Sequence, residues 1–266
     1  MQTQKVIEHI VNWMSNYAQK AKTNGFVLGV SGGVDSAVVS VLAARTGMDT
    51  LLLEMPIHQA SAEVSRAQKH ITELKNQFPN VADIRVDLTP VFDSFQNQTT
   101  DESYSRELRE LALANTRARL RMTTLYYYAQ TNGLLVAGTG NKVEDFGVGF
   151  FTKYGDGGVD ISPIADLLKT QVYALAKELN IVPSIQNAAP TDGLFANSKT
   201  DEEQIGASYP ELEWAMSVAD THGPEDFEGR KKQVLEIYKS RHRANLHKMV
   251  PIPVCEIPDE LLQCTQ

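Results

Sequence analysis

The sequence contains very little cysteine and no long apolar run. Among its 266 residues there are two cysteines, Cys255 and Cys264, both near the carboxyl end. They cannot form a disulfide framework, and no Cys-x-x-Cys pair suggests a zinc or redox site. No apolar run is long enough to cross a membrane. Residues 1–22 also lack the apolar segment and small-residue cleavage site of a secretion signal. We therefore expect a cytoplasmic protein.

Positive charge is also scarce. The chain has 25 Lys and Arg against 33 Asp and Glu, a net charge of −8. Binding to a phosphate backbone usually needs a basic face, so this balance argues against a nucleic-acid partner. The apolar content of 42% is enough to build a sizeable core.

What the first half of the chain does contain is a regular alternation of short apolar segments and helical segments. This rhythm predicts an α/β fold with a doubly wound parallel sheet flanked by helices. The expected strands are 26–30, 49–56, 82–88 and 133–140, and the expected helices between them are 35–46, 61–77 with Ser61 as its N-cap, and 104–131. Residues 90–104, which are polar, are expected to form a mobile loop.

Other helices are predicted from spacing. The N-terminal segment is expected to be an amphipathic helix, because Val6, Ile10, Trp13, Met14 and Tyr17 occur at helical spacing. A second amphipathic helix follows Leu168, with apolar side chains every three or four residues (Val172, Leu175, Ala176 and Leu179). Further helices are expected at 209–219 and 225–241, and a lid or flexible loop at 186–206.

The segment "SGGVDS", residues 31–36, follows the first strand and opens the first helix after it. Its glycines allow a tight turn that exposes backbone amides, and the helix N-terminus favours an anion. Ser31 and Ser36 add hydroxyl groups, but the lysine of an ordinary P-loop is absent. The alternative is that the glycines only form a turn and that Asp35 complements the helix dipole.

Asp35 is the unusual member of this loop, because a carboxylate repels a phosphate unless a cation lies between them. Mg²⁺ is commonly held by one or two carboxylates together with phosphate oxygens. The loop therefore suggests a magnesium-assisted phosphate site.

The SGGVDS pattern resembles the phosphate loop of the N-type ATP pyrophosphatases, members of the adenine nucleotide alpha hydrolase-like superfamily. Those enzymes cleave ATP between its α- and β-phosphates, and the loop cradles the pyrophosphate. The central segments "NTRARLRM", "GTGNKVEDFGVGFFTKYGDGGVD" and "LLKTQVYALAKEL" look like those of the ammonia-dependent NAD⁺ synthetases. This resemblance runs from about residue 5 to about residue 253 and implies a single domain over residues 1–266.

The resemblance implies a ligase that completes NAD⁺ biosynthesis. ATP would adenylate the nicotinate carboxylate of deamido-NAD⁺, and ammonia would displace AMP to form the amide. The stabilising groups would be Mg²⁺, Lys169 and the loop amides, with no covalent nucleophile. Asp35 and Lys169 are the expected catalytic residues.

The resemblance also assigns the binding residues. ATP would be bound by Gly29, Val30, Ser31, Gly32, Gly33, Val34, Asp35, Ser36, Thr139, Lys169 and Thr191. Mg²⁺ would be held by Asp35 and Glu144. Deamido-NAD⁺ would be bound by Arg119, Lys153, Asp160, His247 and Lys248. The cation Lys169 at a helix start opposes the dipole, which suggests that a ligand charge compensates it.

Two departures from the family pattern stand out. His58 and Gln59 lie where many relatives have other polar residues, and no role is assigned to them. The segment "EDFGVGFFTK" is one residue longer than in some relatives, near Phe146.

Glutamine-using relatives carry an additional amidase domain with a catalytic cysteine. This chain has no room for one before the strand at Phe26, so free ammonia is the expected nitrogen donor.

In the helix at 104–131, apolar side chains surround too much of the circumference for one buried stripe. Either the helix is fully buried, or it forms a symmetric dimer interface that shares the deamido-NAD⁺ site between subunits.

Two other functions stay open at this point. A tRNA-modifying ATP pyrophosphatase would need a basic surface and usually sulfur-transfer cysteines, which the composition disfavours. A non-catalytic nucleotide-binding module would not need Glu144, Lys153 and Asp160 together.

Overall fold

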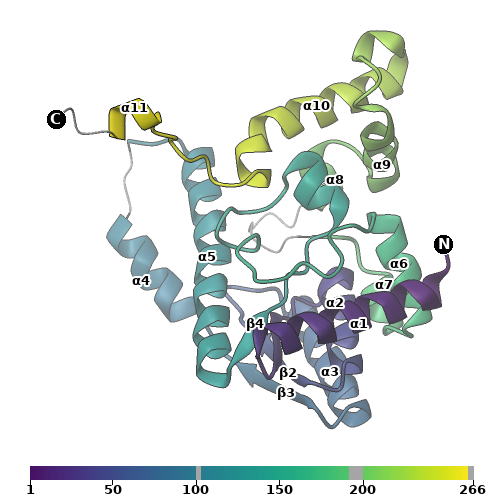
Figure 1. The fold of residues 1–266 in the computed structure, drawn as a ribbon, viewed down its shortest axis with the longest axis vertical. Helices are drawn as coiled ribbons and strands as arrows, with labels where there is room; N and C mark the ends of the chain where they lie inside the picture. The colour runs from purple at the N-terminus through teal and green to yellow at the C-terminus, as the bar shows by residue number, and fades with distance from the viewer. Residues whose placement is uncertain (100–102, 192–199, 263–266) are drawn as a thin grey trace.

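The computed structural model describes residues 1–99, 103–191 and 200–262 (Figure 1). Four parallel strands form the central sheet in the order β3-β2-β1-β4. They are β1 (Gly25–Gly29), β2 (Asp49–Glu54), β3 (Val81–Arg85) and β4 (Leu134–Val136). The chain proceeds outward from β1 to β3 and then crosses back to form β4 on the other side of β1. The predicted doubly wound parallel sheet is confirmed, and its switch point lies between the carboxyl ends of β1 and β4.

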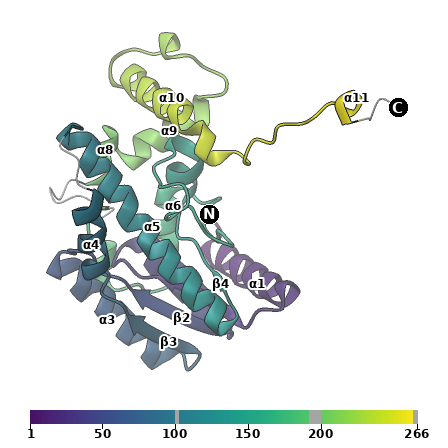
Figure 2. The same cartoon turned by 90° about the vertical axis from the view of Figure 1, so that its left-hand side faces the viewer.

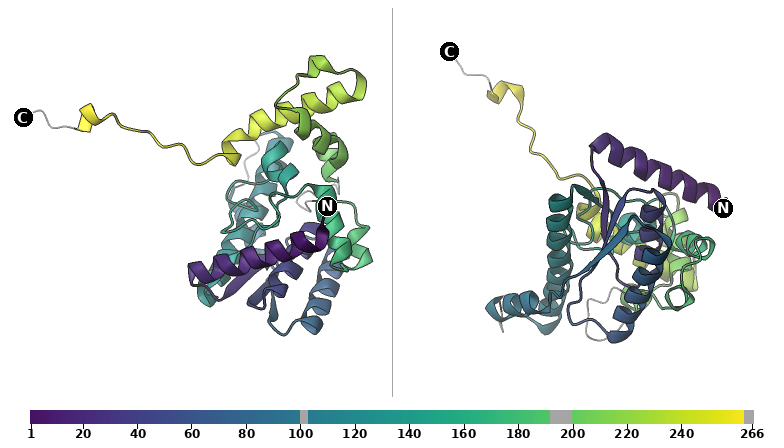
Figure 3. Two further views of the ribbon diagram at one scale, coloured as in Figure 1. Left: turned by 45° about the vertical axis from the view of Figure 1, so that its right-hand side comes forward. Right: turned by 90° about the horizontal axis from the view of Figure 1, so that it is seen from below.

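Both faces of the sheet are covered, which explains why its central strands are runs of apolar residues. Leu28 and Leu52 point into one core cluster, whereas Val27 and Leu51 point into a second cluster on the opposite face. The view from below in Figure 3 shows helices on either side of the strands.

One face is covered by helices from both halves of the chain. These are α1 (Thr3–Ala21), α2 (Val34–Arg45), α3 (Ser61–Gln77), α6 (Lys169–Glu178) and α7 (Pro183–Gln186). The predicted amphipathic helix is present: in α1, Ile7, Ile10, Met14 and Ala18 are buried, whereas Trp13 and Tyr17 are 40% and 42% exposed. The predicted cap at Ser61 is wrong, because Ser61 is the first residue of α3 and Ala60 precedes it in extended conformation.

The other face is covered by α4 (Thr89–Thr99) and α5 (Arg106–Asn132). The expectation of a mobile loop at 90–104 is wrong for residues 90–99, which form most of α4; residues 100–102 lie outside the described ranges. The side chain of Phe92 is completely buried, and the guanidinium carbon of Arg117 lies 4.2 Å from its ring centre. This packing against α5 stabilises a helix that the polar composition did not indicate.

A third core cluster lies beside the carboxyl ends of the strands, at the top of Figure 1. Its main elements are η1 (Val143–Val148), α8 (Asp201–Ile205), α9 (Tyr209–Val218) and α10 (Gly229–Met249), with the short η2 (Pro224–Asp226) between the last two. The helix expected at 225–241 thus starts later and continues further, so His247 and Lys248 belong to its last turn. The chain then leaves the body as an extended arm that ends in α11 (Asp259–Leu262) (Figure 2).

Element η1 is a π-helix around Phe146. In a π-helix each backbone hydrogen bond spans one more residue than in an α-helix, so this element can take up an inserted residue. The expectation that the segment is one residue longer than in some relatives stays a prediction. Within the described ranges, none of the helices combines the length and apolar composition that a membrane crossing requires.

Candidate functional site

The loop between β1 and α2 is held by its own serine hydroxyls. The amide of Gly33 donates to Ser31 Oγ at 3.2 Å, and the Ser36 hydroxyl donates to the Gly33 carbonyl at 3.1 Å. Gly32 has a φ of 84°, and a Cβ on it would lie 2.7 Å from the carbonyl oxygen of Glu63. Glycine is therefore required here for its backbone conformation and for the close approach of α3. The loop and the N-terminus of α2 form a site suited to an anion.

A cavity of about 280 Å³ opens above this loop at the carboxyl ends of the strands. Every residue predicted to bind ATP lines it, namely Gly29–Ser36, Thr139, Lys169 and Thr191, and Glu144 lines it as well. The chain supplies these residues from segments far apart in the sequence.

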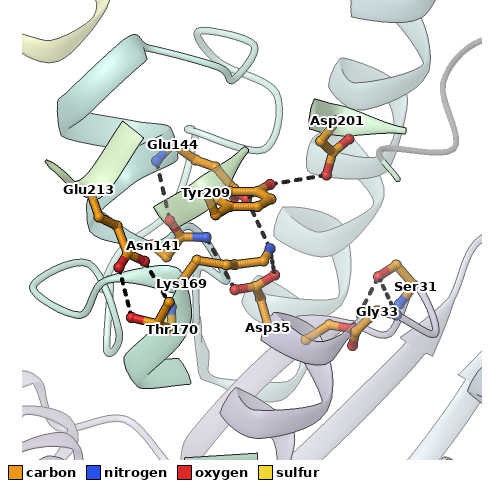
Figure 4. Close-up of polar contacts among 11 residues, drawn as sticks. Ser31, Gly33, Asp35, Asn141, Glu144, Lys169, Thr170, Asp201, Tyr209 and Glu213 are labelled. Carbon is orange, nitrogen blue, oxygen red and sulfur yellow. Dashed lines mark hydrogen bonds and ion pairs between the residues drawn. The ribbon is translucent and has the colours of Figure 1, made fainter. Parts of the chain in front are cut away.

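Lys169 lies at the centre of the charged part of the cavity (Figure 4). Its Nζ is 2.6 Å from Asp35 Oδ2 and 2.9 Å from Glu144 Oε1, and the residue is only 3% exposed. These two carboxylates balance the charge of Lys169, and the expectation that a ligand charge also compensates it stays a prediction.

Two groups that the sequence prediction missed support this centre. The hydroxyl of Tyr209 donates its proton to Glu144 Oε1 at 2.5 Å, and its oxygen lies 3.2 Å from Asp201 Oδ2. Asn141 Nδ2 donates to Asp35 Oδ1 at 3.2 Å. Asn141 belongs to the "GTGNK" segment, so a signal for it was present, whereas Tyr209 is a single tyrosine in a helix with no surrounding motif.

The start of α6 is fixed from α9. Glu213 accepts hydrogen bonds from the backbone amide and the hydroxyl of Thr170, at 2.9 Å and 2.8 Å. A carboxylate at a helix N-terminus is favourable for the dipole. This contact holds the first turn of α6, and with it the backbone of Lys169, in position (Figure 4).

Burial and charge act in opposite directions on the central ionisable groups. Burial raises the pKa of Asp35, and Lys169 offsets this only in part. Burial would also raise the pKa of Glu144, but Lys169 and the Tyr209 hydroxyl outweigh it and lower that pKa. For Lys169, burial would lower the pKa, yet the two carboxylates raise it above its ordinary value. The centre is thus an ammonium between two carboxyl groups.

Two further acids, Asp145 and Asp156, line the cavity beside Glu144. Burial, reinforced by the nearby Glu144, raises the pKa of Asp145 well above its usual range. Burial also raises the pKa of Asp156, although its carboxylate accepts the amide of Thr152 at 2.9 Å.

Of the residues expected to bind deamido-NAD⁺, three lie together. Arg119 Nε donates to the Lys153 carbonyl at 3.3 Å, and Lys153 Nζ donates to the His247 carbonyl at 2.9 Å. They do not line the cavity themselves, but their neighbours Ala118 and Gly155 do.

The remaining two predicted residues make internal contacts. Lys248 Nζ donates to the carbonyls of Gly149 and Phe151, the latter at 2.6 Å. Asp160 accepts the amide of Val136 at 2.8 Å and the Tyr126 hydroxyl at 3.0 Å. In the ligand-free chain, both therefore hold the backbone around the end of β4 and the segment after η1.

The β2 side of the cavity carries polar residues that the sequence prediction left without a role. Arg121 donates to the Met55 carbonyl at 3.1 Å and to Gln59 Oε1 at 2.9 Å. Arg66 Nε donates to the Gly32 carbonyl at 3.3 Å. These contacts connect α3 and α5 to the exit of β2 and to the phosphate loop.

The fold and cavity define a doubly wound α/β protein of the kind that binds ligands at the carboxyl ends of its strands. The chain belongs to the NAD synthase family, whose model matches residues 6–251. This membership disfavours the tRNA-modifying and non-catalytic alternatives.

Individual relatives are similar over nearly their full lengths. The NH₃-dependent NAD⁺ synthetase of Malacoplasma penetrans is 37% identical over 92% of this chain and 94% of its own. Among solved structures, the NMN synthetase from Francisella tularensis has a TM-score of 0.84 at 31% identity, covering 97% of this chain and 100% of that chain. The NH₃-dependent NAD synthetase from Campylobacter jejuni has a TM-score of 0.76 at 26% identity, covering 96% and 100%.

Proposed function

We propose that this protein is an ATP-dependent ligase that converts deamido-NAD⁺ and ammonia to NAD⁺, AMP and pyrophosphate. The observation that carries this proposal is the convergence of Asp35, Glu144 and Lys169 beside the phosphate loop in one cavity. It occurs in a chain that belongs to the NAD synthase family.

In the first half-reaction, a carboxylate oxygen of the nicotinate attacks the α-phosphorus of ATP. The bond to the β-phosphate oxygen breaks, and pyrophosphate leaves. Backbone amides of Gly32 and Gly33 and the hydroxyls of Ser31 and Ser36 hold the leaving group. The Lys169 ammonium balances charge that develops on the α-phosphate, as a preorganised electrostatic group.

In the second half-reaction, ammonia attacks the carbonyl carbon of the adenylated nicotinate. The carbon–oxygen bond to AMP breaks, AMP leaves, and the new amide loses a proton. Ammonia, rather than glutamine, is the proposed donor for this chain.

We include Mg²⁺ in this proposal. The carboxylates of Asp35 and Glu144 have oxygens within 2.6 Å and 2.9 Å of the same Nζ, so they face a common point. Hard oxygen ligands of this kind suit Mg²⁺ when phosphate oxygens and water complete the shell. In the described part of the chain, no three or more His, Cys, Asp or Glu side chains form a group that could hold a metal. When bound, the ion would neutralise phosphate charge beside Lys169.

Deamido-NAD⁺ is proposed to extend from the cavity past Gly155 toward Arg119, Lys153 and His247. Lys248 and Asp160 would act there mainly by holding the backbone that borders the substrate. Substitution of Lys153 should raise the KM for deamido-NAD⁺ more than the KM for ATP.

A symmetric dimer that shares this site is also proposed. The alternative of a fully buried α5 does not hold within one chain, because Leu108, Leu111 and Tyr127 are 59%, 51% and 64% exposed. A strictly monomeric mass by light scattering in an active preparation would refute the dimer. The expected cytoplasmic location stays a prediction.

A second candidate substrate is nicotinate mononucleotide, which lacks the AMP half of deamido-NAD⁺. The likeness to an NMN synthetase over the whole chain favours testing it. Deamido-NAD⁺ and nicotinate mononucleotide would react by the same chemistry. The values of kcat/KM for the two compounds, measured side by side, therefore show which one the enzyme prefers.

The decisive assay measures pyrophosphate release by the purified protein with ATP, Mg²⁺ and ammonium. Release should require deamido-NAD⁺ and should be accompanied by NAD⁺ formation. If the protein acts on nicotinate mononucleotide but not on deamido-NAD⁺, nicotinate mononucleotide is the substrate. Equal rates with glutamine in place of ammonium would contradict the proposed nitrogen donor.

A further inference from the structure

Glu54, the last residue of β2, has an unsatisfied carboxylate oxygen in the wall of the cavity. The residue is 7% exposed, and its Oε1 has no hydrogen-bond partner among the described residues. The nearest ionic partner is Arg85 Nε at 3.6 Å, beyond hydrogen-bond distance. A buried acceptor without a donor costs free energy, and such groups require an explanation.

The position of Glu54 relative to the phosphate loop limits what could satisfy it. The Val30 amide donates to the Leu53 carbonyl at 2.9 Å, so the end of β2 lies directly beside the start of the loop. The reactive centre of Glu144 and Lys169 follows β4, on the other side of β1. A nucleotide whose phosphates occupy the loop, and whose α-phosphate faces Lys169, would therefore direct its nucleoside half toward β2.

The wall on the β2 side suits a nucleoside. Met55, which follows β2, and Val64 of α3 line the cavity and offer apolar surface for a base. Glu54 follows the loop by about twenty residues, at the strand end where dinucleotide-binding proteins place an acid against ribose hydroxyls.

We infer that Glu54 is a specificity-determining residue that accepts a hydrogen bond from the adenosine half of ATP. The donor is either a ribose hydroxyl or the 6-amino group of the base. Guanine and hypoxanthine carry a carbonyl at position 6 instead of an amino group, and this carbonyl oxygen would repel the carboxylate. This inference rests on the proposed use of ATP.

The test measures dissociation constants by calorimetry for ATP, 2′-deoxy-ATP, 3′-deoxy-ATP and ITP. The proteins are the wild type, Glu54→Gln and the matched control Arg85→Gln, which removes the ionic neighbour but keeps the carboxylate. The wild type should bind at least one analogue about tenfold more weakly than ATP, the effect of one lost hydrogen bond to a charged group. In Glu54→Gln, whose amide oxygen is a neutral and weaker acceptor, the preference for ATP should shrink, whereas Arg85→Gln should keep it.

The analogue that is disfavoured identifies the donor, since the deoxy nucleotides report on the ribose and ITP reports on the amino group. The inference is overturned if the wild type does not discriminate, or if Glu54→Gln retains the preference. Loss of the preference in Arg85→Gln as well would assign the effect to the ion pair instead. If Glu54→Gln does not fold, Glu54→Asp should still reduce the preference, because its carboxylate is withdrawn by one methylene.

Nucleotide binding does not require amidation. A protein that shows the Glu54-dependent preference but releases no pyrophosphate with deamido-NAD⁺ would refute the proposed function and leave the inference standing.

Discussion

The Nζ atom of Lys169 lies 2.6 Å from Oδ2 of Asp35, in a contact buried within the protein. Asp35 comes from the first helical turn after the phosphate loop, and Lys169 is the first residue of α6. The ion pair therefore connects two helix N-termini that would both face a bound nucleotide.

Removing this ammonium should destabilise the ligand-free protein strongly. In Lys169→Met, two buried carboxylates lose their cation, and breaking a buried pair in this way costs about 3–5 kcal/mol. Urea unfolding near neutral pH measures the change. The exposed pair of Lys142 and Asp166, at 2.8 Å, gives the control, since Lys142→Met should change stability by less than about 1 kcal/mol. Equal effects of the two substitutions would contradict the structural role of the buried pair.

Asp35→Asn should weaken metal binding in the presence of nucleotide. Even residues that only orient metal ligands change metal affinity by about 10–100-fold, so losing a ligand should cost at least about tenfold. Electron paramagnetic resonance with Mn²⁺ and a non-hydrolysable ATP analogue measures the affinity directly, and Asp166→Asn serves as an exposed control. Full turnover of Asp35→Asn at limiting Mg²⁺ would show the metal assignment to be wrong.

Tyr209→Phe should change the pH dependence of activity. The Tyr209 hydroxyl stabilises ionised Glu144 and contributes to lowering its pKa. Without it, Glu144 stays protonated to higher pH, so the acidic limb of the kcat/KM profile should move to higher pH. Tyr126→Phe, which removes a hydroxyl bonded to Asp160, should leave that limb in place. An unshifted limb in Tyr209→Phe would mean that Glu144 does not control it.

His70 should make the protein less stable at mildly acidic pH. Its Nε2 lies 2.8 Å from Ser40 Oγ between α2 and α3, and burial lowers its pKa from 6.5 to about 4. As the pH falls below 6.5, the unfolded chain takes up a proton on His70 that the folded chain excludes until about pH 4. Stability from this group is therefore complete above pH 6.5 and is lost as the pH falls, by about 2 kcal/mol at pH 5.

Urea unfolding at pH 7.5 and pH 5 measures this loss. In His70→Gln, the difference between the two pH values should shrink by about that amount, whereas His9→Gln, which alters an exposed residue of α1, should leave it unchanged. If the difference in unfolding free energy between the two pH values persists in His70→Gln, other groups cause the loss of stability.

Much of the fold was predictable because it depends on local patterns. The β-α alternation and the SGGVDS loop predicted the parallel sheet and the position of its switch point, and both are confirmed. The buried positions of α6, including Val172 and Leu175, followed from spacing alone. Helix α4 was missed because its stability depends on one buried ring, that of Phe92, packed against a distant helix.

The candidate site was predictable only where its residues belong to extended motifs. All residues predicted for ATP line one cavity, although their roles stay predictions. Tyr209 and Glu54 were missed because their environments arise from tertiary packing, which no local spacing encodes. The burial of Lys169 between two carboxylates was missed for the same reason.

The π-helix between Val143 and Val148 has a consequence for how this segment can vary. A π-helix takes up an inserted residue within one turn, so an insertion here need not move Glu144 and Lys153 apart. Phe146 is 47% exposed, which makes it the natural residue to lose. A chain without it could close the turn into an ordinary α-helix, so a one-residue deletion here is compatible with the same catalytic geometry.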